Sequence, residues 1–343
     1  MRPPTFQDIV AAREFIAPYL PKTPLVRIAR ISEELGCDYY AKLENLQPTG
    51  AFKVRGGVNL VGSYRTARGS ERVKDTTSAN NQAALITAST GNHGQSIAFA
   101  GRLFGARVII YAPVENVNES KMQAMRDLGA EVRLHGCDFD EARLECERVA
   151  RAESFRYVHS ANEPGLIAGV GTVGLEIFED LPDVDVIITP AGGGSCASGN
   201  CIVANQLNQR VRVIAVQSEA APAMWHSWRN RSLDPYPTMK TEHEGLATRV
   251  PFELTNKILW ELLDDFVLVS DEEINEAIRF LARDAKQVAE GAGAASLAAA
   301  IKLRDRGRGS SPTIREGLRG KKVVGILTGG NIPLARLAKL MSG

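Results

Sequence analysis

The sequence predicts an α/β protein in which parallel strands alternate with helices. Short runs rich in β-branched residues indicate buried strands, at residues 107–113, 184–192, 212–219 and 323–330. Two of these runs, VDVIITPAG and VVGILTGG, end in glycine, and segments with helical spacing of apolar residues lie between the runs. Apolar runs that end in glycine and lead into helices are typical of βαβ units, whose strands are buried on both faces.

The helical segments follow in order along the chain. Apolar residues recur at helical spacing in residues 95–104, 119–128 and 271–283. Asp271 follows the apolar run FVLVS and precedes Glu273, which indicates a helix start at this point. The segment AEGAGAASLAAA (289–300) predicts a tightly packed helix that opens on a glycine. Two polar stretches, 67–82 and 305–317, predict exposed loops.

Composition and charge exclude several classes of protein. The chain has 343 residues and a net charge of +1, so neither nucleic acid nor an anionic membrane is an expected partner. Its five cysteines form no CxxC pair, which suits a reducing cytosol and argues against a disulfide framework or a zinc cluster. No segment looks like a signal peptide or a membrane span. We therefore expect a cytoplasmic globular protein.

The segment KLENLQPTGAFKVRGG (42–57) carries the most informative residue, Lys53. Lys53 lies between Phe52 and Val54, with glycines at 50, 56 and 57. Glycine lets the backbone approach a ligand closely, and Phe52 offers an apolar wall. A desolvated amine loses part of its charge, which a lysine that forms a Schiff base requires. The alternative is an ordinary surface lysine.

A second segment, ASTGNHGQS (88–96), joins an apolar run to a helical pattern. Such a turn exposes backbone N–H groups at a helix N-terminus and can seat a carboxylate or a phosphate. Ser89 or Thr90 can equally serve as the helix cap, and the two interpretations are compatible because the same donors serve both. His93 by itself is more often structural than catalytic, so it receives a minor role.

A third segment, TPAGGGSCASGN (189–200), also follows a strand that appears buried in the sequence pattern. Ordering consecutive glycines costs backbone entropy, so three in a row indicate a specific structural or binding role. They allow the chain to wrap an anion, and the helix after Ser195 would direct its dipole at that anion.

The same segment supports an alternative. Gly192, Gly194 and Ala197 match the pattern GxGxxA, and Glu219 ends the next strand, as in a dinucleotide-binding fingerprint. A dinucleotide-dependent dehydrogenase would leave Lys53 and the turn at 88–96 unexplained, so it is the weaker hypothesis.

Together with a fourth segment, ILTGGN (326–331), these segments resemble the fold-type II pyridoxal-phosphate enzymes. Within that family the chain is most similar to the branch of threonine/serine dehydratases and serine racemases. The resemblance runs from residue 23 to the last glycine turn. It implies a fold like that of the tryptophan synthase β chain, with two open twisted sheets flanked by helices. Residues 1–48 with 155–343 would form a large cofactor-binding domain and residues 49–154 a small domain.

The resemblance also implies the residues that hold pyridoxal 5'-phosphate. Lys53 would form the Schiff base and move the Cα proton, and Phe52 would pack beside the cofactor. Asn92 would bind the ring hydroxyl, and Thr328 would face the pyridine nitrogen. The phosphate would be cradled by the third segment, that is by Gly192, Gly193, Gly194 and Ser195.

The substrate carboxylate would be held by the second segment, that is by Ser89, Thr90, Gly91, Asn92 and His93. The implied reaction is the β-elimination of a β-hydroxy amino acid such as L-threonine or L-serine, which yields a 2-oxo acid and ammonia. A neutral hydroxyl such as that of Thr328 favours elimination over transamination, because it does not force protonation of the ring nitrogen.

Two other reactions stay open. A β-replacement or threonine-synthase-like reaction is the nearest rival, although His93 after Asn92 favours the dehydratases. Racemisation is also open, because Thr90 stands as a possible catalytic hydroxyl where the racemase has a serine. The racemase branch has carboxylates at a metal site, where this chain has Gln217 and Ala223, so we expect no metal there. Glu219 and Glu244 could contribute to a different metal site.

The resemblance further implies a homodimer, and the short segment after the last turn implies no appended regulatory domain. Residues 221–249 are expected to include the pocket for the substrate side chain or its lid. Within them, two tryptophans, 225 and 228, and two histidines, 226 and 243, are candidates for that pocket. Core or dimer-interface positions are the favoured alternative for the two tryptophans and a histidine.

Overall fold

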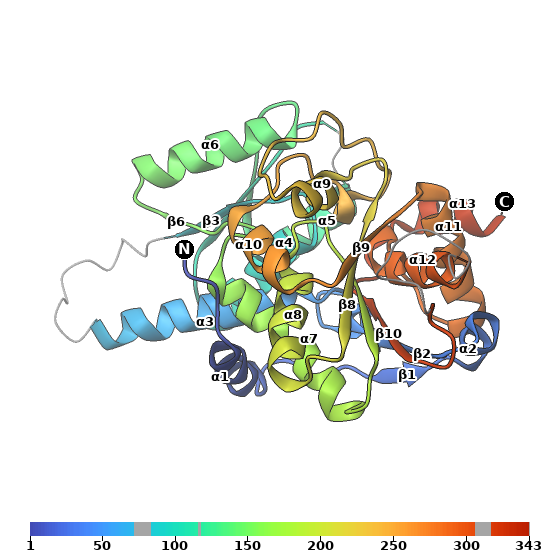
Figure 1. Ribbon diagram of the computed structural model, residues 1–343. Coiled ribbons are helices and arrows are strands. Elements are labelled where there is room, and N and C mark those ends of the chain that lie inside the picture. Colours follow the sequence, from blue (N-terminus) through green and yellow to red (C-terminus); the bar gives the residue numbers. More distant parts are fainter. Residues whose placement is uncertain (72–83, 116–117, 306–316, 343) are drawn as a thin grey trace.

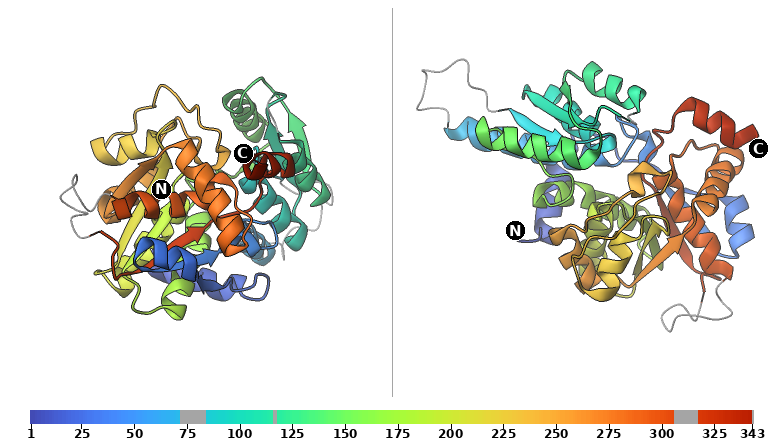
Figure 2. Two further views of the ribbon diagram at one scale, coloured as in Figure 1. Left: turned by 90° about the vertical axis from the view of Figure 1, so that its right-hand side faces the viewer. Right: turned by 90° about the horizontal axis from the view of Figure 1, so that it is seen from above.

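The computed structural model describes residues 1–71, 84–115, 118–305 and 317–342. Within them, two separate β-sheets are each packed against helices (Figure 1). Figure 2 shows the smaller sheet and its helices as a lobe that lies against the rest of the molecule. The α/β class and the two open sheets agree with the prediction from the sequence.

The larger sheet has six strands in the order β1-β2-β10-β7-β8-β9, and all of its neighbours are parallel except β1 and β2. Its strands are β1 (Leu25–Arg27), β2 (Asp38–Leu43), β7 (Val186–Pro190), β8 (Arg212–Ser218), β9 (Asp265–Val269) and β10 (Lys322–Leu327). Helices α2 (Ala29–Leu35), α11 (Asp271–Phe280) and α12 (Gly291–Asp305) share a hydrophobic core with one face. The core of the other face includes α1 (Phe6–Ile16), α7 (Pro164–Asp180), α8 (Ser195–Leu207) and α10 (Glu253–Leu262).

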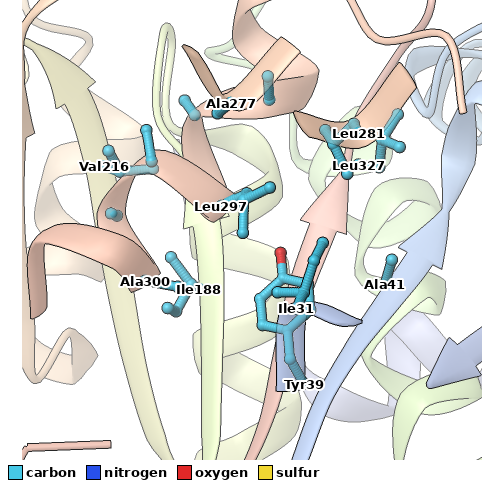
Figure 3. Close-up of a cluster of buried hydrophobic side chains, with 14 of the residues drawn as sticks. Ile31, Tyr39, Ala41, Ile188, Val216, Ala277, Leu281, Leu297, Ala300 and Leu327 are labelled. Atoms are coloured by element: carbon cyan, nitrogen blue, oxygen red, sulfur yellow. The ribbon is translucent and has the colours of Figure 1, made fainter. Parts of the chain in front are cut away.

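Alternation along the strands decides which core each residue joins. In β7, Ile187 packs with α7 and α8, whereas Ile188 packs with α12 on the opposite face. Figure 3 shows Leu297 and Ala300 of α12 lying over Ile188 and its neighbours. Both faces of this sheet are therefore buried, as the continuous apolar runs predict.

The smaller sheet has four parallel strands in the order β5-β4-β3-β6. These are β3 (Leu85–Ala88), β4 (Val108–Ala112), β5 (Glu131–Leu134) and β6 (Arg156–Tyr157). One face packs with α3 (Lys53–Glu71), α4 (Asn92–Phe104) and α5 (Glu119–Asp127), and the other packs with α6 (Phe139–Ala152). The remaining helices are α9 (Ala223–Asn230), α13 (Leu334–Ser342), the short turns η1 (Glu44–Leu46) and η3 (Glu244–Leu246), and a π-helical turn η4 (Leu281–Ala285).

The four strands and the helices expected from the sequence are confirmed, with ends that shift by a few residues. Ser270 and Glu273 form a capping box at the start of α11, so the expected helix start at Asp271 is correct. Helix α11 gives way to the π-helical turn at Leu281, earlier than the expected end at residue 283.

The loop expected at residues 67–82 is wrong at its beginning, because α3 continues to Glu71. Alanine and arginine are good helix formers, and a helix already nucleated by buried residues extends at little cost. Residues 72–83 and most of the second expected loop (306–316) lie outside the described residues.

The expected domain limits stay a prediction. The strands of the larger sheet come from residues 25–43 and 186–327, and those of the smaller sheet from residues 85–157. Strand β6 pairs with β3 in the smaller sheet, although residues 156–157 lie just beyond the expected limit of the small domain.

Candidate active site

A cavity of about 540 Å³ lies where the carboxyl ends of strands from both sheets meet. Every site residue expected from the sequence lines this cavity: Phe52, Lys53, Ser89, Thr90, Gly91, Asn92, His93, Gly192, Gly193, Gly194, Ser195 and Thr328. Parallel strands place the loops after their carboxyl ends at one edge of a sheet, which brings these distant segments together. The structure thus supports a single site, while the role of each residue stays a proposal.

Lys53 is the first residue of α3 and extends its amine across the cavity. Its Nζ lies 3.3 Å from the carbonyl oxygen of Ser160 and 3.2 Å from Oγ of Ser195. The ring centroid of Phe52 is 5.3 Å from the same nitrogen. These neighbours are uncharged, and burial lowers the pKa of Lys53 to about 8. The amine is therefore partly neutral near physiological pH, as the sequence predicts.

The turn before α4 lines the cavity and is held by the side chain of Ser89. Oγ of Ser89 accepts hydrogen bonds from the N–H groups of Gly91 and Gly94, at 3.1 and 2.9 Å. Gly91 occupies the N-cap position, two residues after Ser89. The expectation that Ser89 or Thr90 is the N-cap residue is therefore wrong, although Ser89 accepts a hydrogen bond from the first turn of α4 through the N–H of Gly94.

His93 is a neutral imidazole with a fixed tautomer. The hydroxyl of Thr87 donates to the carbonyl oxygen of Val158 at 2.7 Å and lies 2.9 Å from Nε2 of His93. Because the only hydroxyl proton of Thr87 is donated to Val158, Thr87 can only accept from His93, so Nε2 must carry the proton of the ring. Burial lowers the pKa of His93 to about 3. Its Nδ1 is buried and has no hydrogen-bond partner among the described residues.

The glycine turn between β7 and α8 has the geometry of an anion seat. Gly194 adopts a left-handed conformation, with φ of 82°, at the N-cap of α8. A Cβ on Gly192 would lie 2.1 Å from the carbonyl oxygen of Gly245, so only glycine is accommodated. Thr248 donates to the carbonyl oxygen of Gly192 and so helps to fix the turn. A glycine turn at a helix N-terminus offers its backbone N–H groups as a cradle for an anion. An amine, this N–H cradle and the hydroxyl of Thr328 suit pyridoxal phosphate well.

The last glycine turn is joined directly to the segment that carries Lys53. The N–H of Phe52 donates to the carbonyl oxygen of Thr328 at 2.9 Å, and the N–H of Gly330 donates to that of Gly50 at 2.9 Å. Thr328 itself is buried at the end of β10. The two segments therefore hold each other in place at the floor of the cavity.

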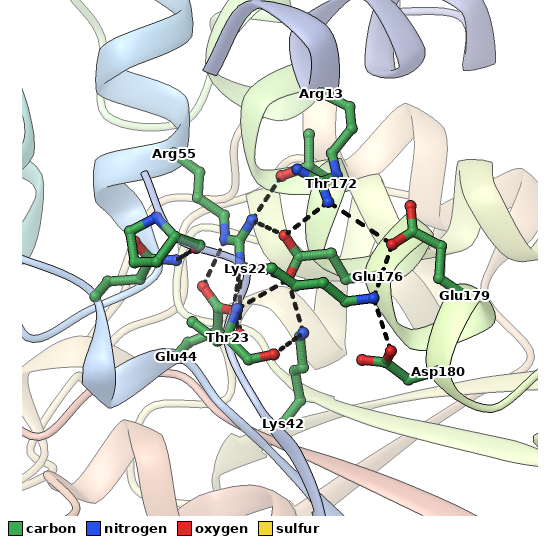
Figure 4. Close-up of polar contacts among 12 residues, drawn as sticks. Arg13, Lys22, Thr23, Lys42, Glu44, Arg55, Thr172, Glu176, Glu179 and Asp180 are labelled. Carbon is green, nitrogen blue, oxygen red and sulfur yellow. Dashed lines mark hydrogen bonds and ion pairs between the residues drawn. The ribbon is translucent and has the colours of Figure 1, made fainter. Parts of the chain in front are cut away.

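A buried ion network surrounds Arg55, which follows Lys53 by two residues in the sequence (Figure 4). Arg55 pairs with Glu44 and Glu176 at 2.7 Å each, and Lys42 pairs with Glu176 at 2.7 Å. Burial opposes the charge of Arg55, but the two carboxylates outweigh it and raise its pKa. Similarly, Arg55 and Lys42 outweigh the effect of burial and lower the pKa of Glu176. Lys42, Glu44 and Arg55 all belong to the same sequence segment as Lys53.

The cavity includes ionisable residues that the sequence did not reveal. Nζ of Lys121 lies 2.9 Å from Glu244 and 3.7 Å from Glu290. Burial disfavours its charge, but Glu290 and Glu244 outweigh burial and raise the pKa of Lys121. Burial raises the pKa of Glu290 against the opposing effects of Lys121 and Asn92. Lys121 lies on an amphipathic helix and Glu290 before a small-residue helix, and neither position carries a local signal.

His159 is a further cavity residue that the sequence did not reveal. Its Nδ1 accepts hydrogen bonds from the N–H groups of Ala161 and Asn162, both at 3.0 Å. Burial lowers the pKa of His159 to about 4, so the ring is neutral with its proton on Nε2.

The segment 221–249 contributes to the cavity, but through different residues from those considered. Thr241, Glu244, Thr248 and Arg249 line it. The two tryptophans, 225 and 228, instead pack against the core of the larger sheet, and His243 is buried with Nε2 3.3 Å from the carbonyl oxygen of Asp271. Trp225, Trp228 and His243 are therefore core residues and do not line the substrate pocket.

Gln217 has a structural role. Its Oε1 accepts hydrogen bonds from the N–H groups of Met224 and Trp225, at the start of α9. Among the residues that the structure describes, no cluster of three or more histidine, cysteine or acidic side chains is arranged to hold a metal. Glu219, which the dinucleotide hypothesis requires beside the glycine turn, does not line the cavity.

Comparisons with known proteins agree with a site for pyridoxal phosphate. The family model described as "Pyridoxal-phosphate dependent enzyme" matches residues 16–329. An L-threonine ammonia-lyase from Thermotoga maritima is 37% identical over 342 residues, which cover 98% of this chain and 78% of that relative. A catabolic L-threonine dehydratase from Staphylococcus aureus is 34% identical over 332 residues, which cover 96% of this chain and 90% of that relative.

A solved structure of maize serine racemase superimposes with a TM-score of 0.87 at 28% sequence identity. The match covers 99% of this chain and 98% of the racemase. No helix in the described part of the chain is long and apolar enough to cross a membrane.

Proposed function

Since the chain belongs to the pyridoxal-phosphate-dependent enzymes and uses pyridoxal 5'-phosphate, we propose that it is an ammonia-lyase. Its substrate would be a β-hydroxy amino acid such as L-threonine or L-serine, and its products a 2-oxo acid and ammonia. Two relatives with these activities in their names match the chain almost from end to end. The observation that carries the proposal is the amine of Lys53, which is half-buried beside the glycine turn and has no carboxylate partner among the described residues.

Lys53 is proposed to move the proton at the substrate Cα. When bound, the cofactor supplies an electron sink for the electrons left at that carbon. A base works best when its pKa is close to the working pH, and burial brings the pKa of Lys53 to about 8. The carbonyl oxygen of Ser160 and the hydroxyl of Ser195 accept from its Nζ and orient the amine across the cavity.

The turn before α4 is proposed to bind the substrate carboxylate. The turn lies at the positive end of the dipole of α4, and Ser89 fixes its shape by accepting from the N–H groups of Gly91 and Gly94. His93 stays neutral, so the carboxylate would be held by hydrogen bonds and the helix dipole without a charge from this ring. The glycine turn at 192–195 would hold the phosphate, and Thr328 would offer a neutral hydroxyl to the ring nitrogen.

A second candidate activity is racemisation of the same amino acids. It is favoured by the hydroxyl of Thr90, which lines the cavity, and by the similarity to maize serine racemase. A β-replacement reaction, the third alternative, would need a second substrate and would release no ammonia.

A panel of amino acids tests these alternatives with one protein preparation. We expect 2-oxo acid and ammonia from at least one of L-threonine, L-serine, 3-hydroxyaspartate and phenylserine, without any second substrate. Chiral chromatography of the remaining amino acid measures racemisation in the same tube. Absence of 2-oxo acid from every β-hydroxy amino acid would contradict the lyase proposal, and turnover only with an added nucleophile would indicate β-replacement.

We also propose that the protein acts in the cytoplasm as a homodimer. The five cysteines are free, and four of them are buried, which suits a reducing compartment. Light scattering of the purified protein measures the assembly, and a mass of one chain would contradict the dimer.

A further inference from the structure

Asn331, the last residue of the TGGN turn, has an amide whose orientation the backbone determines. Its Nδ2 lies 2.8 Å from the carbonyl oxygen of Thr49, which can only accept a hydrogen bond. The NH₂ end of Asn331 must therefore be at this position. The same nitrogen lies 2.8 Å from the amide of Asn92. Because an NH₂ group only donates, Asn92 must turn its carbonyl oxygen Oδ1 toward Asn331.

The opposite end of the Asn92 amide is determined by Glu290. Nδ2 of Asn92 lies 2.5 Å from Oε1 of Glu290, a side chain that is 8% exposed. The N–H of Glu290 donates to the carbonyl oxygen of Gly329, and Oε2 faces Nζ of Lys121 at 3.7 Å. Oε1 accepts from Asn92 whether the carboxyl group is ionised or carries a proton on Oε2. The contacts with Asn331 and with Glu290 thus require the same orientation of the Asn92 amide.

We infer that Asn331 and Glu290 are positioning residues that turn the NH₂ end of Asn92, and not its carbonyl, to the ligand. Glu290 uses one of the two N–H groups of Asn92, and the second stays available on the cavity that Asn92 lines. The acceptor is an oxygen of the bound cofactor, so the inference rests on the proposed function. A carbonyl in the same place could only accept a hydrogen bond and could not donate one to that oxygen.

Four segments that are distant in sequence take part in this arrangement, namely residues 49–53, 89–92, 289–291 and 328–331. Gly50 shows how closely they pack. It has a φ of 68°, and a Cβ there would lie 2.5 Å from Oδ1 of Asn331. A side chain at residue 50 would displace the amide of Asn331, so this glycine is required by the positioning of Asn92 as well as by its own backbone.

The experiment compares two pairs of variants by their affinity for pyridoxal 5'-phosphate and by the visible absorbance of the bound cofactor. Asn331→Asp keeps the shape of the side chain but cannot donate to Asn92, and Glu290→Ala removes the acceptor. Each should weaken cofactor binding about ten- to hundredfold and shift the absorbance maximum, because an unmatched buried polar group costs the full hydrogen bond. Glu290→Gln keeps an acceptor for Asn92 and should stay within about threefold of the natural protein.

Asn45→Asp is the matched control. Nδ2 of Asn45 donates to the carbonyl oxygen of Val288 at 3.2 Å, beside the same glycine turn but without contact to Asn92. It should leave cofactor affinity and absorbance unchanged. Natural affinity and absorbance in Asn331→Asp would overturn the inference. Equal losses in Asn45→Asp and Asn331→Asp would also overturn it, because they would show a general effect on folding.

These measurements need no substrate. If the natural protein bound the cofactor but produced no 2-oxo acid, the proposed function would fail while the positioning of Asn92 would still be measured. The two conclusions can therefore be contradicted separately.

Discussion

At the scale of single residues, the environment of Lys53 sets its chemistry. The amine is surrounded by a carbonyl oxygen, a hydroxyl and an aromatic ring, so nothing nearby compensates for the loss of water around its charge. Burial lowers the pKa from 10.5 to about 8. The neutral, reactive form of Lys53 is therefore populated well below the pH at which surface lysines lose their proton.

This shift predicts a pH dependence that can be measured without the cofactor. The reaction rate of a lysine follows its neutral fraction, so Lys53 should reach half of its maximal rate at about pH 8, whereas an ordinary lysine reaches half at about pH 10.5. Reductive methylation of the cofactor-free protein at a series of pH values, followed by peptide mass spectrometry, gives the rate at each lysine. Lys339, in the exposed C-terminal helix, is the internal control. A reaction midpoint for Lys53 equal to that of Lys339 would contradict the prediction.

At the scale of helices and strands, the buried network of Arg55 fixes the helix that begins with Lys53. Arg55 lies two residues after Lys53 and reaches Glu176 on α7 and Glu44 on η1. Thr172 and Thr23 complete its set of acceptors. All three guanidinium nitrogens of Arg55 donate hydrogen bonds, and this arrangement specifies one position for α3 and so one position for its first residue.

Arg55→Met should lower the free energy of unfolding by about 3–5 kcal/mol, because it leaves a buried carboxylate without compensation. The double variant Arg55→Met with Glu44→Gln should recover part of this loss, since it removes the stranded charge. Urea denaturation measures both. Arg27→Met breaks an exposed pair with Asp38 and should cost less than about 1 kcal/mol. Equal losses in Arg55→Met and Arg27→Met would contradict the argument.

The glycine turn before α8 gives a second prediction at this scale. Gly192→Ala would place a Cβ 2.1 Å from the carbonyl oxygen of Gly245, a backbone atom that cannot move aside cheaply. We expect the variant to lose cofactor affinity by at least about tenfold. Gly165→Ala, in the first turn of α7, is the control, because its new Cβ would meet nothing closer than 3.5 Å. Titration with pyridoxal 5'-phosphate separates the two, and unchanged affinity in Gly192→Ala would count against the anion seat.

The elements and the site differ in how much of them the sequence reveals. Strands β4, β7, β8 and β10 can be recognised in the sequence because each is buried on both faces and is therefore a continuous apolar run. Lys53 and the glycine turns are visible because glycine beside a strand end is locally unusual. Lys121 and Glu290 have no unusual local sequence. Their place in the site depends on a contact between residues that are 169 positions apart, which the sequence does not show. The continuation of α3 to Glu71 was missed for a related reason, because its support comes from packing earlier in the helix.

At the scale of the whole molecule, the cavity is shared between the two sheets and their helices. Lys121 on α5 pairs with Glu244 on η3, and Asp140 on α6 pairs with Arg249 in the loop that follows η3. Asn92 on α4 contacts Glu290 and Asn331 from the other side. Polar contacts around the cavity thus join the smaller lobe to the larger, in addition to the close packing of α3 against α7.

The pair of Asp140 and Arg249 tests that relation between the lobes. The two side chains line the cavity but are 28% and 44% exposed, so their pairing should contribute less than about 1 kcal/mol to folding. Because each belongs to a different lobe, its loss should instead favour an open cavity and raise the KM for the amino acid about two- to tenfold, with a smaller change in kcat. Asp140→Asn, Arg249→Gln and the double variant form a thermodynamic cycle for KM and for the melting temperature. A double variant whose KM equals the product of the two single effects would show that the contact does not couple the lobes, whereas a double variant no worse than either single one would place the coupling in this pair.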